Sequence, residues 1–154
     1  MALVSASFSG WERLEKALLD AFEEWAVEDI NKAHWDDQFK TEKWKHSPLT
    51  IRANGEKAES PRDIYDLGNL YQSGIDSLKI ERMSSAIEAN WHWDAKNRSG
   101  QEYAWYVHEG WGTNDPYPRK FTDDISIAAS FFRKAPGKAL KLRVSQHLAT
   151  INAR

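Results

Sequence analysis

The chain has 154 residues, a formal net charge of −2 and no cysteine. The near-neutral charge argues against nucleic acid as the main partner, and the lack of cysteine excludes disulfides, thiolate metal sites and a cysteine nucleophile. The length predicts one domain over residues 1–154, and we expect neither a signal peptide at its start nor a membrane span. Eight tryptophans are the unusual feature, for which core packing is the favoured explanation and interface anchoring the alternative.

The first predicted element is a long helix over residues 1–34. Ser9 can cap it, and Glu12 three residues later completes a capping box. Apolar residues recur behind this cap at helical spacing, with charged residues on the opposite face. The apolar stripe consists of Trp11, Leu14, Leu18, Phe22, Trp25 or Ala26, and Ile30. We therefore expect one buried face along a helix that ends near Ala33 or His34.

Residues 35–62 have no sustained hydrophobic period and are predicted to be a long loop with a hairpin. Pro48, Pro61 and the turn-like Asn-Gly-Glu of residues 54–56 interrupt them. Residues 49–52, Leu-Thr-Ile-Arg, could form a short strand before that turn.

Residues 63–154 are predicted to hold a sheet and shorter helices. Residues 75–83 are a mixed strand candidate, whereas residues 85–94 alternate cleanly between apolar and polar side chains. Their apolar face consists of Ile87, Ala89, Trp91 and Trp93. Such alternation is typical of a half-buried antiparallel strand, and we expect a helix to cover this face, although a stacking platform for ligands is the alternative.

The last third of the chain predicts two helices and one further strand. Residues 101–110 read as a short helix ended by Gly110, and Thr122 can cap a helix that Pro136 and Gly137 end. The tail after residue 137 alternates Leu140, Leu142 and Val144, which suggests a strand, with a helix as the alternative. The predicted fold class is α+β, an antiparallel sheet packed on one face by the long N-terminal helix and the shorter helices.

Few side chains are spaced as catalysis or metal binding requires. His92 and Asp94 lie on one strand face, close enough to share a metal or a proton, although solvent exposure is the favoured explanation. Two weaker candidates are the pair of His108 and Glu109, which diverge by about 100° on a helix, and the group of His34, Asp36 and Asp37. We expect no catalytic residue, no metal and no cofactor, and therefore no enzyme.

Residues 63–75, Asp-Ile-Tyr-Asp-Leu-Gly-Asn-Leu-Tyr-Gln-Ser-Gly-Ile, place a glycine inside an apolar-periodic segment. A glycine costs a helix about 1 kcal/mol relative to alanine, so either the backbone needs it or something packs against it. In this reading Asp66 caps a short turn and Gly68 relieves crowding. Leu70 points into the core and Ser73 bonds back to the backbone.

Three segments of the chain carry a family pattern in order. The first is matched by Asp66, Gly68, Leu70 and Ser73, with Leu67 where threonine is usual. The second is matched by Tyr103, Ala104, Val107, His108 or Glu109, Gly110 and Thr113, and the third by Pro118, Phe121 and Thr122, with Lys120 where a second proline is common. Over about residues 44–134 the chain thereby resembles the neck or tail-completion family of tailed bacteriophages.

The resemblance implies a structural protein of the virion that joins the head connector to the tail by forming a ring. It implies as partners other copies in a hexameric ring, the head connector or stopper, and the tail terminator or tail tube, with at most non-specific passage of DNA and no membrane. It places the protein in the neck or tail of the virion, and in the host cytoplasm during assembly. The alternatives are a tail terminator, a Trp-rich carbohydrate- or peptide-binding module, and a hydrolase built on His92 and Asp94.

Ring subunits need surfaces that contact their neighbours, and loops commonly supply them. The long loop over residues 35–61 and the loop over residues 111–120 are the expected contact regions. The interface candidates are Trp35, Trp44, Trp105 and Trp111, because each is expected in or beside a loop.

Overall fold

The computed structural model describes residues 11–52, 54–57, 59–83, 86–110, 115–125 and 131–152. Its elements in chain order are α1 (Trp11–Glu24), the π-helix η1 (Trp25–His34), α2 (Trp35–Lys40), α3 (Asn69–Asp76), β1 (Lys79–Arg82), β2 (Ile87–Asn90), α4 (Ala104–Glu109), the 3-10 helix η2 (Phe131–Arg133) and α5 (Ala135–Asn152). The two strands pair antiparallel, with Lys79 opposite Asn90. The predicted α+β class is confirmed.

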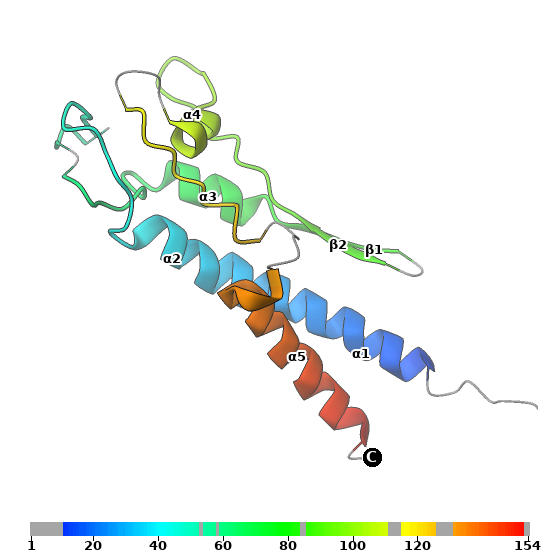
Figure 1. Cartoon of the computed structure of the whole chain (residues 1–154). Helices are drawn as coiled ribbons and strands as arrows, with labels where there is room; N and C mark the ends of the chain where they lie inside the picture. The colour runs from blue at the N-terminus through cyan, green and yellow to red at the C-terminus, as the bar shows by residue number, and fades with distance from the viewer. Residues whose placement is uncertain are drawn as a thin grey trace, which may run out of the picture.

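The N-terminal helix is longer than predicted, because α1, η1 and α2 form one continuous rod over residues 11–40 (Figure 1). The predicted end near His34 is therefore wrong. Trp25, Ile30 and Trp35 are each at most 4% exposed and recur every five residues, the spacing that the hydrogen bonding of a π-helix brings onto one face. The π-helix thus carries the buried face forward into α2, where Phe39 is also fully buried.

Tryptophan rings form the centre of the core. The indole of Trp35 lies edge-on to Trp91, with 5.8 Å between ring centroids, and to Trp93, at 5.0 Å. Both partners follow β2, which is shorter than the predicted strand. The prediction that a helix covers this face is confirmed, because the covering ring belongs to α2.

The N-terminal half of the rod is less buried than its sequence predicts. In α1 the buried side chains are Ala17 and Ala21, whereas Trp11 is 62% and Leu18 41% exposed. The part of the predicted stripe that includes Trp11 and Leu18 is therefore wrong. The physical reason is that α5 packs along a neighbouring face of α1, where two alanines allow close approach (Figure 1).

The tail of the chain is the 18-residue helix α5, so the predicted strand is wrong and the helical alternative is correct. Pro136 and Gly137 lie in the first turn of α5. The prediction that they end a helix is therefore wrong. Proline is tolerated there because the first N–H groups of a helix have no partner within it. The Nε1 of Trp25 donates to the carbonyl oxygen of Pro136 at 2.8 Å, and a Cβ on Gly137 would lie 2.3 Å from the carbonyl oxygen of Phe131.

The helix predicted after Thr122 falls partly outside the described residues. Its described parts are turns up to Ile125 and the 3-10 helix η2.

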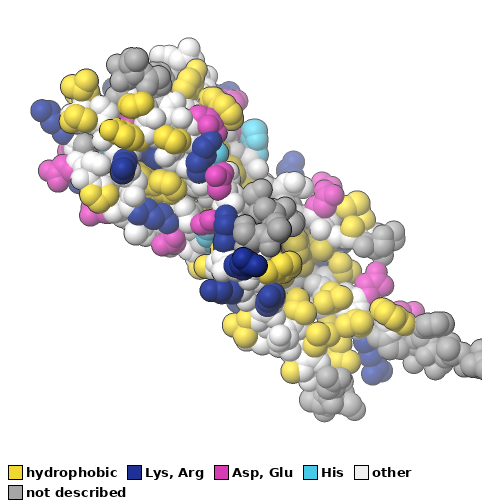
Figure 2. Space-filling model, in the orientation of Figure 1, with side chains coloured by type: hydrophobic (Ala, Val, Ile, Leu, Met, Phe, Trp, Pro, Cys, Tyr) yellow, Lys and Arg dark blue, Asp and Glu magenta, His cyan; other side chains and the backbone are white. Residues whose placement is uncertain are grey.

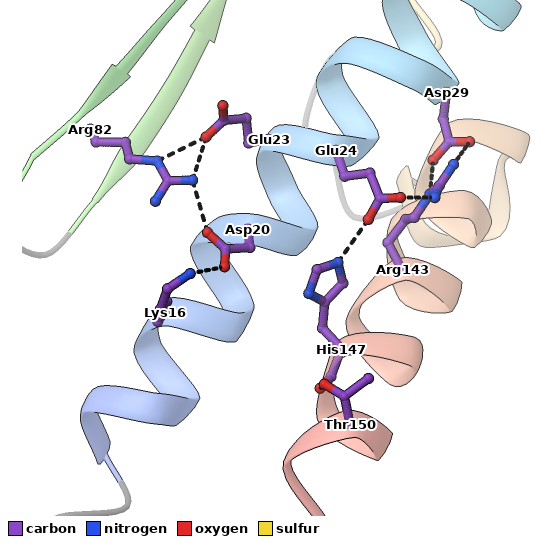
Figure 3. Close-up of polar contacts among 9 residues, drawn as sticks. All are labelled: Lys16, Asp20, Glu23, Glu24, Asp29, Arg82, Arg143, His147 and Thr150. Atoms are coloured by element: carbon purple, nitrogen blue, oxygen red, sulfur yellow. Dashed lines mark hydrogen bonds and ion pairs between the residues drawn. The ribbon is translucent and has the colours of Figure 1, made fainter.

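Ion pairs fasten α5 and the hairpin of β1 and β2 to opposite sides of the rod (Figure 3). On one side, the Nε of Arg143 donates to Asp29 at 2.9 Å, Arg143 also pairs with Glu24, and the Nε2 of His147 lies 2.7 Å from Glu24. On the other, Arg82 pairs with Asp20 at 3.0 Å and with Glu23. These contacts hold α5 and the hairpin in place along α1 and η1.

Candidate functional site

The three segments of the family pattern, distant in sequence, meet at the end of the molecule that contains α2, α3 and α4 (Figure 1). A cavity of about 850 Å³ lies among them. Its walls include Leu70 from the first segment, Tyr103 and Val107 from the second, and Arg119 from the third. Burial raises the pKa of Tyr103. This cavity is the candidate functional site.

In the first segment, the backbone conformation before α3 requires the glycine at position 68. Gly68 has a φ of +80° just before α3, in the left-handed region that glycine adopts without strain, and a Cβ there would also lie 2.9 Å from the ring of Tyr65. Leu70 is 3% exposed, and the hydroxyl of Ser73 donates to the carbonyl oxygen of Leu70 at 2.9 Å, both as predicted.

The carboxylate that caps the turn before α3 is that of Asp63, which accepts from the backbone N–H of Tyr65 at 2.9 Å. Asp66, predicted to cap this turn, has a φ of 42° and its carboxylate lies 3.6 Å from the Nε of Arg52. Both carboxylates therefore face the same arginine.

The second and third segments are joined through His108. Its Nε2 lies 2.9 Å from the hydroxyl of Thr122, and its Nδ1 lies 2.8 Å from Glu109. The expectation that His108 and Glu109 diverge is wrong, because α4 ends at Glu109 and the long side chain of Glu109 reaches back to the ring. The backbone N–H of Arg119 also donates to the carbonyl oxygen of His108 at 2.9 Å. Thr122 thus binds His108, in place of its predicted role as a cap.

Gly110, which follows α4, has a φ of +90°, and a Cβ there would lie 3.0 Å from the backbone of Pro116. Phe121 is 2% exposed and packs edge-on to His108 at 5.1 Å, whereas Pro118 is exposed. The end of α4 and the segment after Asp115 are therefore held in close contact.

Two arginine–aspartate pairs, one part-buried and one buried, line the cavity and form what we call its polar floor. Arg52 donates to Asp63 at 2.9 Å, with side chains 8% and 17% exposed. Arg119 pairs with Asp115, with side chains 5% and 11% exposed. Burial alone would raise the pKa of Asp63, but the hydrogen bond from Arg52 lowers it below its ordinary value.

Arg119 also binds the loop that contains Lys45 and His46. It donates to the carbonyl oxygen of Lys45 at 3.1 Å and to the Nδ1 of His46 at 3.0 Å. Because a guanidinium can only donate, Nδ1 of His46 accepts and the imidazole is neutral. Burial and the nearby Arg119 both lower the pKa of His46, which keeps the ring neutral.

Exposed apolar side chains line one part of the cavity, with Ile51 67%, Leu67 56% and Tyr65 37% exposed, and the exposed Lys96 and Arg98 line another. A general base needs a pKa near the working pH, but the pairing with arginine stabilises the carboxylate of Asp63 in its ionised form. This arrangement suits the positioning of loops around an apolar docking surface.

The four tryptophans expected at interfaces lie in different environments. Trp35 is helical and 1% exposed, so the expectation that it lies in or beside a loop is wrong, because its ring fills the core. Trp44 is half-buried and donates to the carbonyl oxygen of Gln38 at 2.6 Å. Trp105, on α4, is 68% exposed. Trp111 lies outside the described residues.

The other candidate groups are dispersed. His92 and Asp94 are exposed and follow the end of β2. Burial lowers the pKa of His34 to about 4. Asp36 binds the hydroxyl of Tyr71 at 2.5 Å, and Asp37 pairs with Lys43 at 2.6 Å. Among the described residues, no group of three or more histidines and carboxylates could hold a metal ion.

Sequence reasoning missed the buried charges of the cavity floor. Arg52 and Asp63 are eleven residues apart and Arg119 reaches a loop 73 residues earlier, and no local spacing indicates such pairs. The only local signal was Asp115 four residues before Arg119, a spacing that pairs charges on a helix, which this segment does not form.

Comparison of the chain with protein-family models, with curated proteins and with solved structures finds no match. Within the part of the chain that the structure describes, no helix is both long and apolar enough to cross a membrane.

Proposed function

We propose that this protein is a structural subunit of the neck of a tailed bacteriophage, and that copies of it form a ring that joins the head connector to the tail. The observation that carries the proposal is the meeting of the three family-like segments. Leu70, Val107 and Arg119, from one segment each, line one cavity. Segments that carry a pattern in sequence and pack together in space behave as one architectural unit.

A ring subunit that joins head and tail needs surfaces that bind neighbouring subunits, and it needs no catalytic group. Exposed aromatic and aliphatic side chains near the cavity supply such a surface, with Trp105 68% and Tyr106 43% exposed on α4 and Leu49 77% exposed in the loop after α2. Large apolar side chains exposed in this way favour protein contacts. The partners proposed are other copies of the chain, the head connector or stopper, and the tail tube or terminator.

The binding-module alternative receives less support from the packing. Trp91 and Trp93, the two rings that could have formed a stacking platform, pack edge-on to the buried Trp35. Their indoles are therefore part of the core of the protein.

The test is electron microscopy of particles made after the reading frame is deleted from its genome of origin. Filled heads beside separate, complete tails are expected for a neck protein, whereas tails of abnormal length would identify a terminator. Normal infectious particles would overturn the proposal. Complementation with Trp105→Ala, compared with the wild-type chain, asks whether the exposed face of α4 takes part in joining.

A further inference from the structure

The surface of α1 carries large apolar side chains that the described residues leave partly exposed. Trp11 is 62% and Leu18 41% exposed, and they lie seven residues apart, which places them on one face of the helix. Figure 2 shows hydrophobic side chains gathered over the α1 and α5 end of the molecule. The fully buried side chains of α1 are alanines, and its bulky Phe22 packs against the core near the start of η1.

The outer face of α5 presents a smaller apolar surface. Leu142 is 60% exposed, and Lys138 and Lys141 precede it by four residues and one residue. Both lysines are exposed. Leu142 therefore lies near two positively charged side chains on the exposed surface of α5.

The two helices have opposite charge. Residues 11–29 contain seven acidic and two basic residues, a net charge of −5, whereas residues 131–152 contain five basic and no acidic residues, a net charge of +5. The arginine and acidic side chains that tie α5 to the rod use part of this charge within one molecule (Figure 3).

Lys16, Glu28 and Lys134 also pair within the chain, but other charged side chains of these ranges have no ion partner among the described residues. Glu12 and Glu15 on α1 and Lys138 on α5 are exposed, and among the described residues none has an ion partner within 4.0 Å. Glu15 lies four residues after Trp11 and three before Leu18, so it borders the apolar face of α1. The α1 face is thus apolar with an acidic border, and the α5 face is apolar with a basic border.

We propose that these two faces bind each other between copies of the chain, with Leu142 and its lysines on one copy docking on Trp11, Leu18 and Glu15 of the next. A second copy is the occupant because both complementary faces are present on every chain, and the docking buries the apolar side chains that one protomer leaves exposed. The contact joins two different surfaces, which is the kind of interface that generates rings. The inference rests on the proposed function in taking the partner to be another copy.

The first test measures the mass of the full chain in solution by size-exclusion chromatography with light scattering, over a range of concentrations. The wild-type chain is expected to assemble, and Leu18→Glu and Leu142→Glu to weaken assembly by at least about tenfold, one order of magnitude corresponding to 1.4 kcal/mol. Met83→Glu is the matched control, since Met83 is 45% exposed but follows β1 and lies on neither of the two faces. A monomeric wild-type chain, or Leu18→Glu and Leu142→Glu variants that assemble like the wild type, would overturn the inference.

The second test reverses charges on each face. The double variants Glu12→Lys with Glu15→Lys, and Lys138→Glu with Lys141→Glu, are each expected to dissociate the assembly. The chain with all four changes should assemble again, because the two borders are complementary once more. Failure of the fourfold variant to regain mass, while its melting temperature stays that of the wild type, would contradict the pairing. Particle morphology remains the separate test of the proposed function, so failure of the contact between the α1 and α5 faces and failure of the neck role give different results.

Discussion

Gly74 of α3 lies so close to the indole of Trp93 that a Cβ on it would come within 2.1 Å of Nε1. This contact joins the middle of α3 to the segment after β2. Trp93 in turn lies edge-on to Trp35 of α2. One glycine thereby sets how closely three parts of the chain approach in the core.

Gly74→Ala is expected to lower the free energy of unfolding by about 1–3 kcal/mol, because overpacking outweighs the gain in helix propensity. Chemical denaturation followed by tryptophan fluorescence measures the change. Gln72→Ala, at an exposed position of the same helix, is the control and should change stability by less than about 0.5 kcal/mol. An unchanged or more stable Gly74→Ala protein would show that Trp93 can move aside.

Trp35 and Trp105 are expected to differ sharply when each is replaced by alanine. Trp35 is 1% and Trp105 68% exposed. Trp35→Ala should cost about 3–5 kcal/mol through the cavity it leaves, whereas Trp105→Ala should stay within about 0.5 kcal/mol. Thermal and urea unfolding of the two variants provide the comparison, and equal losses would contradict the packing described.

Arg119→Met should destabilise the protein by about 3–5 kcal/mol, because it leaves the carboxylate of Asp115 buried without its partner. The double variant Arg119→Met with Asp115→Asn should be less destabilised than the single variant, because the uncompensated charge is gone. A double-mutant cycle measured in urea tests this. Purely additive effects would argue against a coupled buried pair.

His34 is expected to make the protein less stable in mild acid. Its pKa falls from the ordinary 6.5 to about 4 through burial, so between these values the unfolded state binds more protons than the folded state. Stability is then full above pH 6.5 and decreases as the pH falls towards 4, by roughly 3 kcal/mol in all.

His34→Gln, which cannot titrate, should have a flatter dependence of stability on pH in this window, as measured by urea unfolding at successive pH values. His46, whose pKa is also lowered, contributes in the same sense and leaves a residual slope. Identical slopes for the variant and the wild type would mean that His34 takes up its proton equally well in both states.

Local pattern predicted much of the secondary structure. The period of the N-terminal helix, the alternation around β2 and the glycine after α4 each have a local cause, so each could be read from neighbouring residues. The same reasoning failed at residues 35–40, since a π-helix changes the periodicity that a sequence pattern assumes. It also failed at Pro136, because a proline that could end one helix can equally begin the next.

The sequence by itself determined the α+β class, the burial of Leu70 and the covering of the Trp91 and Trp93 face, because hydrophobic periodicity and turn chemistry act over a few residues. Only the tertiary structure decided which face of α1 is buried, since that depends on where α5 packs. It also decided the buried pairs of Arg52 with Asp63 and of Arg119 with Asp115. Charges can be buried only where the fold brings their partners within hydrogen-bonding distance, and no local pattern encodes that meeting.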